Sequence, residues 1–179
     1  MKPTLEEIGG ECASFRDSFS TLVLGTANGE GLPEASYAPF VLEPDGSMFV
    51  YVSDLSRHTA NLRESGLASV LMIENEGDAQ HLFARRRLTM QCDCELVGRE
   101  DGRWSEVLDR FKARFGDLVD VLREMQDFHL FRLVPRSGTY VRGFAQAYEL
   151  SGPELGEIRH IRDQGHTSSR QQAETAGEE

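Results

Sequence analysis

The sequence predicts a mostly β fold of the α+β class, with six mostly antiparallel strands and a few flanking helices. Three observations predict it. Short β-rich segments are separated by tight-turn signals, the helical hydrophobic period is confined to two stretches, and the strand pattern returns after residue 126. A small closed barrel would remove the exposed strand edges of such a sheet. An open sheet with helices on one face is the alternative, and periodicity does not choose between them.

The first three strands are predicted before residue 54. The segment from Phe19 to Thr26 is β-rich and ends at the turn signal "ANGEG". It is followed by "LPEASYAPFVL", which ends at "EPDG", and then by "SMFVYVS". Strands that follow one another through tight turns in this way indicate an antiparallel meander.

A short helix and two further strands are predicted next. The helix covers "RHTANLRESG", with Ser56 as its N-cap and Gly66 as the residue that ends it. The nearly continuous apolar segment "LASVLMIE" predicts a strand that is buried on both faces, and "NEGDAQHLFA" predicts a loop or a single turn. The following strand alternates, and its apolar face carries Leu88, Met90, Cys92, Cys94 and Leu96.

Two helices separated by Gly116 are predicted where the hydrophobic period changes. The first presents one apolar face, made by Trp104, Val107, Leu108 and Phe111. A second helical face is made by Phe115, Leu118, Val119 and Leu122. After them, "DFHLFRLVP" and "GTYVRGFAQAYEL" return to the strand pattern and complete the predicted sheet.

Composition excludes several classes of function. The 179 residues suit one domain, and the net charge of -11 argues against general nucleic-acid binding, which needs clustered cations. The apolar runs are too short to cross a bilayer, and the N-terminal segment has no secretory signal, so no membrane partner is expected. Three cysteines give no disulfide framework and fit a reducing compartment, which predicts a cytoplasmic protein.

Arginines mark one candidate binding surface. Arg85, Arg86 and Arg87 open the predicted fifth strand, and Arg85 and Arg87 lie on its polar face. A charged rim that keeps a sheet edge soluble explains them without a ligand. An anchor for a carboxylate or a phosphate explains them equally well, because arginine binds both groups in bidentate fashion.

The start of the first predicted helix is a second candidate. It carries Ser56, Arg57, His58 and Thr59. A helix N-terminus with hydroxyl groups and a cation favours anion binding, whereas a capped helix with exposed charges is the simpler interpretation.

The remaining candidates are cysteines, histidines and one aspartate. Cys92 and Cys94 are interpreted as buried core residues, because a metal site needs further ligands. Asp127 either ends a loop or orients a histidine by accepting a hydrogen bond. His160 and His166 lie in a polar, glycine-broken segment that is either a solvated tail or an arm that carries a ligand.

Seven segments together carry a family resemblance. In order they are "FSTLVLGT", "ASYAPFV", "FVYVSDLSRHTANL", "LASVLMIE", "FARRRLT", "DFHLFRL" and "GTYVRGFAQAYELSG". With "RRRLT", "RGFAQAYEL" and the late "GH" as its most specific parts, the chain resembles the HugZ/HutZ heme-utilization family, within the pyridoxamine 5′-phosphate oxidase-like split-barrel superfamily. The resemblance covers about Phe15 to Arg170, and the short spacing from barrel to tail is similar to that of the HutZ branch.

The resemblance implies a homodimeric split β-barrel with heme at the dimer interface. It implies that His166 is the axial ligand of the heme iron, with His160 as its rival, and that Asp127 orients that ligand. It also implies that Thr21 is a hydrogen-bond neighbour of Asp127 across the dimer. Arg87 is expected near a heme propionate or near the bound oxygen, with Arg85 as a further cofactor-binding residue.

The implied activity is oxidative cleavage of heme to a biliverdin-type product and free iron, with an external electron donor and a possible heme-delivery protein as partners. The wider superfamily suggests an FMN-binding oxidoreductase as the alternative. Members of the oxidase branch hold the FMN phosphate with a Ser-Arg-Lys triplet, and Ser56, Arg57 and His58 retain the first two residues of it. The second strand, "PEASYAPF", has no cation, which favours heme over FMN. A non-catalytic heme store or carrier is a third possibility.

Three regions are expected. Residues 1–150 would form the split-barrel domain and residues 151–170 the arm with the heme ligand. Residues 171–179 would form a disordered acidic tail.

Overall fold

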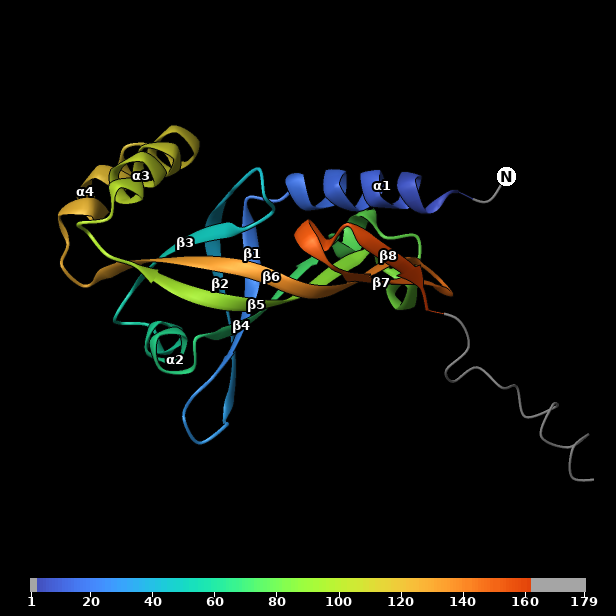
Figure 1. The fold of residues 1–179 in the computed structure, drawn as a ribbon, viewed down its shortest axis with the longest axis horizontal. Coiled ribbons are helices and arrows are strands. Elements are labelled where there is room, and N and C mark those ends of the chain that lie inside the picture. Colours follow the sequence, from blue (N-terminus) through green and yellow to red (C-terminus); the bar gives the residue numbers. More distant parts are fainter. Residues whose placement is uncertain (1–2, 162–179) are drawn as a thin grey trace, which may run out of the picture.

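The structure is a computed structural model that describes residues 3–161 of the chain. Six antiparallel strands close into a barrel in the order β3-β2-β1-β4-β5-β6, because β3 also pairs with β6 (Figure 1). The predicted barrel is therefore confirmed, and the open sheet is excluded. The strands are β1 (Thr21–Ala27), β2 (Pro33–Leu42), β3 (Met48–Ser53), β4 (Leu67–Ile73), β5 (Arg87–Val97) and β6 (Phe128–Gly143).

The strand β6 extends beyond the barrel and carries a second, smaller part of the sheet. Its first half pairs with β3 and its second half pairs with β7 (Gln146–Ser151), while β5 runs beside both halves. The last strand, β8 (Glu157–His160), pairs with β7 and was not predicted. Within the described part of the predicted arm, residues 157–160 therefore continue the sheet as β8. Residues 162–170, and the predicted tail, lie outside the described residues.

The strand pattern after residue 126 was recognised in two segments, "DFHLFRLVP" and "GTYVRGFAQAYEL". The structure joins the first of them to "GTYVRG" in the single strand β6. A proline interrupts this strand, and proline has no N–H group to donate to a neighbouring strand. The structure accommodates Pro135 at a register shift, where Arg136 is the extra residue opposite Gln91 and Cys92.

Within residues 3–161, four helices and three 3-10 turns surround the barrel. The predicted helices are confirmed as α2 (Arg57–Ser65), α3 (Gly102–Phe115) and α4 (Leu118–Glu124), whereas α1 (Leu5–Asp17) was missed. The missed helix begins with a capping box of Thr4 and Glu7 and ends near the barrel. The 3-10 turns are η1 (Glu76–Asp78), η2 (Leu82–Ala84) and η3 (Pro153–Leu155).

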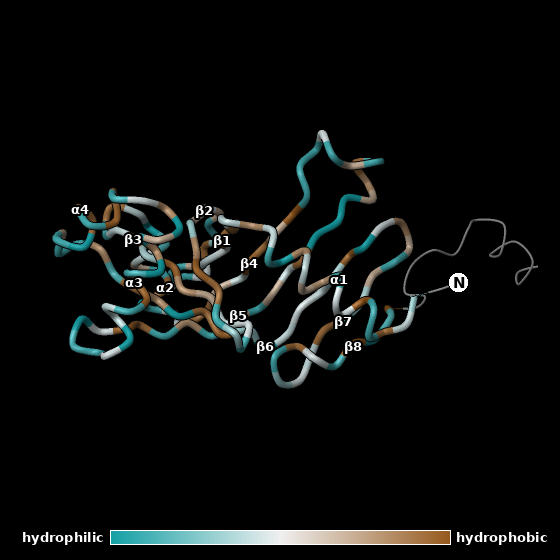
Figure 2. The backbone as a smooth tube through the Cα atoms, turned by 90° about the horizontal axis from the view of Figure 1, so that it is seen from above, coloured by the Kyte–Doolittle hydropathy of each residue, from teal (hydrophilic) through white to brown (hydrophobic). Residues whose placement is uncertain are grey.

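The helices divide between two ends of the molecule. Seen from above, α3 and α4 lie at one end, whereas α1 lies with β7 and β8 toward the other (Figure 2). Each group covers its own hydrophobic core. The barrel interior and the buried face of α1 make one core, and a second core joins α3 and α4 to the outer side of β3 and β6.

Burial differs from the prediction in β4. The strand was expected to be buried on both faces, but only Ala68, Val70 and Met72 are buried, and the residues between them are partly exposed. In the described part of the chain no helix covers the outer face of this strand. The apolar residues on the outer face of β4 are therefore left partly exposed in the single chain.

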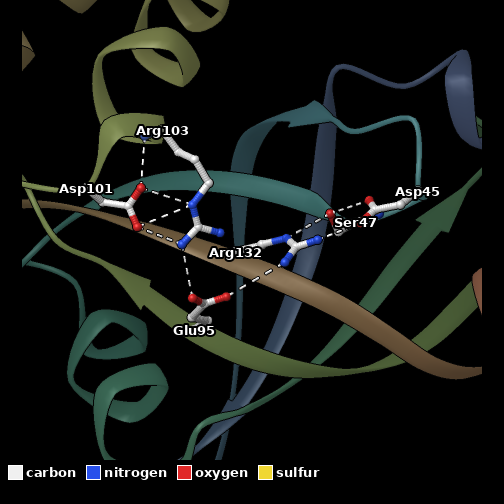
Figure 3. Close-up of polar contacts among 6 residues, drawn as sticks. All are labelled: Asp45, Ser47, Glu95, Asp101, Arg103 and Arg132. Carbon is white, nitrogen blue, oxygen red and sulfur yellow. Dashed lines mark hydrogen bonds and ion pairs between the residues drawn. The ribbon is translucent and has the colours of Figure 1, made fainter.

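An ion-pair network fixes the start of α3 to the barrel (Figure 3). Asp101 caps the helix by accepting from the backbone N–H of Arg103 (2.9 Å), and the guanidinium of Arg103 also donates to Glu95 on β5 (3.2 Å). The network continues over β6 to the turn before β3, and its members are Asp45, Ser47, Glu95, Asp101, Arg103 and Arg132. The donors from Arg103 lower the pKa of Asp101 from 3.8 to about 2.

We expect Asp101→Asn to lower the melting temperature at pH 7, because asparagine keeps the helix cap but loses the charge. A carboxylate with a lowered pKa stabilises the fold above its ordinary pKa, and this stabilisation is lost as the pH falls through its folded-state pKa of about 2. The difference in melting temperature between Asp101→Asn and the parent should therefore become smaller as the pH falls from about 4 to about 2. Thermal unfolding by circular dichroism across this range measures it.

The matched control is Asp117→Asn at the start of α4. The side chain of Asp117 is 96% exposed, makes no cap hydrogen bond and approaches Lys112 only at 4.0 Å. This change should leave the melting temperature near that of the parent. A loss in Asp101→Asn that is constant with pH would contradict the ionic explanation.

Candidate functional site

Asp127 lies at the junction of β3 and β6, just before β6 begins. The hydroxyl of Ser53, the last residue of β3, donates to its Oδ2 at 2.8 Å. The backbone N–H of Asp54 donates to its carbonyl oxygen, also at 2.8 Å. The half-buried carboxylate is thus bonded through one oxygen, and it faces the turn that leads from β3 into α2.

A second contact fixes the same turn. Nε2 of His129 lies 2.8 Å from Oδ2 of Asp54, and Arg63 donates to the other oxygen of that carboxylate at 3.2 Å. The hydrogen bond with His129, and then the contact with Arg63, lower the pKa of Asp54. Sequence reasoning missed Ser53 and Asp54, because neither residue belongs to a motif or to a periodic pattern.

The start of α2 does not bring its candidate residues together. Ser56 occupies the predicted N-cap position without a side-chain cap bond, and Arg57 is exposed. His58 is buried, and its Nδ1 lies 2.8 Å from the hydroxyl of Ser36 on β2. Burial lowers the pKa of His58. The imidazole therefore points into the protein, between the helix and the barrel, rather than beside Arg57.

The three arginines before β5 have different partners. Arg85 donates to the carbonyl of Glu74, and Arg86 donates to its carboxylate. Arg87 differs, because within residues 3–161 its side chain donates only to a backbone carbonyl, that of Arg85 at 3.1 Å. A guanidinium has five N–H donors, so Arg87 keeps most of its donors for a ligand.

Thr21 and Arg87 share the outer face of the barrel. On β1 Leu22, Leu24 and Thr26 are buried, which turns Thr21 outward, and on β5 burial of Leu88 turns Arg87 outward. Only β4 lies between these two strands. Within residues 3–161 of one chain no hydrogen bond joins Thr21 to Asp127, and the predicted contact across a dimer stays a prediction.

Of the two late histidines, only His160 is described by the structure. His166 lies outside the described residues. His160 ends β8, and its ring stands at 88° to that of Tyr148, with 5.0 Å between the centroids. Its Nδ1 is buried and has no hydrogen-bond partner among the described residues. A groove of about 1260 Å³ runs beside it and includes Leu5, Arg142, Phe144, Ile158 and Arg159.

Cys92 is a core residue, as predicted, whereas Cys94 is only partly buried and packs against the same core. Cys92 is 1% exposed inside the barrel, and burial raises the pKa of both Cys92 and Cys94 to about 12. Both thiols are therefore protonated at neutral pH, which leaves them inert as nucleophiles or ligands. Within residues 3–161 there is no group of three or more His, Cys, Asp or Glu side chains that could hold a metal ion. No helix in this range is long and apolar enough to span a membrane.

Comparison with known proteins places the chain in a family. A family model described as pyridoxamine 5′-phosphate oxidase matches residues 8–142. The chain is 42% identical over 156 residues to heme oxygenase HutZ of Vibrio cholerae, covering 87% of this chain and 88% of that one. It is 31% identical over 123 residues to HOZ, a chloroplastic heme oxygenase of Arabidopsis thaliana, covering 69% of this chain and 36% of the relative.

Solved structures agree with this assignment. The structure of HutZ, described as the heme storage protein of Vibrio cholerae, superposes with a TM-score of 0.67 over 71% of this chain and 89% of that one. ChuZ of Campylobacter jejuni is 27% identical and superposes with a TM-score of 0.82 over 93% of this chain and 68% of that one. The predicted resemblance is confirmed: the chain belongs to the HugZ/HutZ heme-utilization family of pyridoxamine 5′-phosphate oxidase-like split barrels.

Proposed function

We propose that this protein binds heme and cleaves its porphyrin oxidatively, to a biliverdin-type product and free iron. The observation that carries the proposal is the similarity to a protein named heme oxygenase along 87% of the chain. The bound heme would be both substrate and cofactor, and its iron would supply the oxygen chemistry. The chain itself would bind and orient the heme.

The described residues fit such a ligand. A heme site needs an axial ligand such as an imidazole, cations for the propionates and apolar walls for the ring. Arg87 has unused donors on the outer face of the barrel. The groove beside β8 has apolar side chains, and its arginines Arg142 and Arg159 are ion-paired with Glu11 and Glu149. Arg85 and the α2 residues Ser56, Arg57 and His58 are secondary candidates for contacts with the cofactor.

His166 is the proposed axial ligand. It follows Ile161, the last described residue, by only five positions, and an extended chain of that length spans about 17 Å. Asp127 would accept a hydrogen bond from the second nitrogen of this imidazole, which fixes the ring orientation and strengthens the ligand as a donor. Arg87 would hold a propionate in bidentate fashion. Thr21, on the same outer face of the barrel, would form a hydrogen bond with Asp127 across the dimer.

We also propose that the protein works as a homodimer with heme at the interface. The outer face of the barrel supports this proposal, because it carries exposed apolar side chains in register. Val23 on β1 pairs with Tyr37 on β2 and with Leu71 on β4, and Val23 and Tyr37 are 39% and 68% exposed. A partner that covers this face would also reach Thr21 and Arg87. An electron donor and a heme-delivery protein are further proposed partners.

A heme store that does not degrade its ligand is the second candidate function, because the structure of HutZ is described as that of a heme storage protein. FMN is the alternative ligand, and it is less favoured. The third residue of the phosphate-binding triplet is His58, which is buried against Ser36. Parallel titrations with hemin and with FMN, followed by addition of a reductant in air, distinguish the heme-degrading enzyme, the heme store and the FMN-binding protein. An enzyme binds hemin stoichiometrically and releases iron on turnover, whereas a store only binds it.

We expect His166→Ala to weaken heme binding by at least about tenfold and to change the Soret band, because loss of a group that only supports a ligand already costs 10- to 100-fold. Hemin titration followed by absorption measures both effects. His160→Ala is the matched comparison and should bind heme like the parent. If the two variants exchange these outcomes, His160 is the ligand.

For Asp127→Asn we expect most of the heme affinity to remain, whereas turnover falls by about 10- to 100-fold and its pH dependence changes. The reason is that an amide accepts a weaker hydrogen bond than a carboxylate does. Loss of the Soret band with ascorbate in air, in the presence of catalase, gives the rate. Parent-like rates at every pH would exclude Asp127 from the mechanism.

A further inference from the structure

The turn between β3 and α2 is fixed to the start of β6 by three contacts of equal length. Two of them reach Asp127: the hydroxyl of Ser53 donates to Oδ2, and the N–H of Asp54 donates to the carbonyl oxygen, each at 2.8 Å. The third joins Asp54 to Nε2 of His129, also at 2.8 Å. Two of these three contacts do not involve the Ser53 hydroxyl.

The direction of the Ser53 hydroxyl is determined by its neighbours. A serine hydroxyl has one hydrogen to donate and lone pairs that accept. The N–H of Leu55 donates to this oxygen at 3.1 Å, which occupies a lone pair. The hydrogen is therefore directed to Asp127, and the hydroxyl acts as a fixed donor rather than a free rotor.

This donor restricts a torsion that is otherwise soft. The terminal torsion of an aspartate side chain is broad and roughly two-fold, so burial of the chain does not orient the carboxylate plane. A fixed donor on Oδ2 holds that plane and assigns the two oxygens different tasks. Among residues 3–161 no hydrogen bond reaches Oδ1 of Asp127, so it is the oxygen left to accept from another group.

We propose that Ser53 is a positioning residue for Asp127, which holds Oδ2 so that Oδ1 accepts the N–H of the axial histidine. This inference rests on the proposed function, because it needs Asp127 to act on the heme ligand. Ser53 does not touch heme. A small rotation of the acceptor matters, since catalytic groups lose activity when they are displaced by an ångström.

The experiment compares full-length Ser53→Ala and Ser53→Thr with the parent. Ser53→Ala should keep the melting temperature and bind hemin within about threefold of the parent, because the two other contacts hold the turn. Its ferric heme spectrum should shift, and turnover should fall about tenfold with a changed pH profile. Ser53→Thr keeps a hydroxyl on the same atom and should restore both the spectrum and the rate.

The matched control is Ser65→Ala at the other end of α2. Its hydroxyl donates to the carbonyl of Asn61 at 2.8 Å and accepts from the backbone N–H of Leu67 at 3.2 Å, so this change, like Ser53→Ala, removes a donated and an accepted hydrogen bond. This variant should match the parent in spectrum and rate. If Ser65→Ala reproduces the effects of Ser53→Ala, the effect is a general loosening of α2 and the proposal is overturned.

A double-mutant cycle with Asp127→Ala separates the possible failures. If Ser53 acts through Asp127, adding Ser53→Ala to the Asp127→Ala variant changes the turnover rate by less than about twofold and leaves the ferric heme spectrum unchanged. An equal effect in both backgrounds overturns the positioning role. An impaired Asp127→Ala beside an unaffected Ser53→Ala also overturns it, but leaves the proposed function intact. A parent-like Asp127→Ala instead overturns the role of Asp127 itself.

Discussion

The pairing of β3 with β6 is the interaction on which the rest of the structure depends. It runs from Met48 opposite Leu133 to Ser53 opposite Phe128 and closes six strands into a barrel. Closure removes two exposed strand edges and gives each strand an inner and an outer face. Because β6 is 16 residues long, the same strand also carries β7 and β8 beyond the barrel.

The register of this pairing builds the candidate site. With Ser53 opposite Phe128, the residue before β6 must lie beside the turn that follows β3. Asp127 and Ser53 are 74 positions apart in the chain, yet they are joined by a hydrogen bond of 2.8 Å. The same closure turns Thr21 and Arg87 outward, because their neighbours Leu22 and Leu88 fill the interior. The site therefore divides between one end of the barrel and its outer face.

Charge distribution explains how an acidic chain could bind an anionic ligand. The net charge of -11 opposes such binding at long range, and most arginines near the surface are occupied by carboxylates. Arg103 bonds to Asp101 and Glu95, and Arg86 bonds to Glu74. Arg87 donates only to a carbonyl within the described residues. Local donors of this kind, rather than the overall field, would select a carboxylate ligand.

The sequence by itself determined the elements whose signals are local. Alternation predicted the barrel strands, the change of period predicted α3 and α4, and Gly66 ends α2 with a positive φ of 64° as expected. The family followed from short motifs, and the structure and the comparisons agree with it. One local inference was incomplete, because the helix α1 was missed.

Only the tertiary structure decided which residues meet. Hydrophobic patterns say which face of a strand is buried, but they carry no information about partners that are distant in sequence. The hydroxyl that orients Asp127 and the burial of His58 against Ser36 therefore appear only when the barrel closes. The physical reason is that strand register, set by packing of the whole core, fixes the positions of polar side chains to within a hydrogen-bond length.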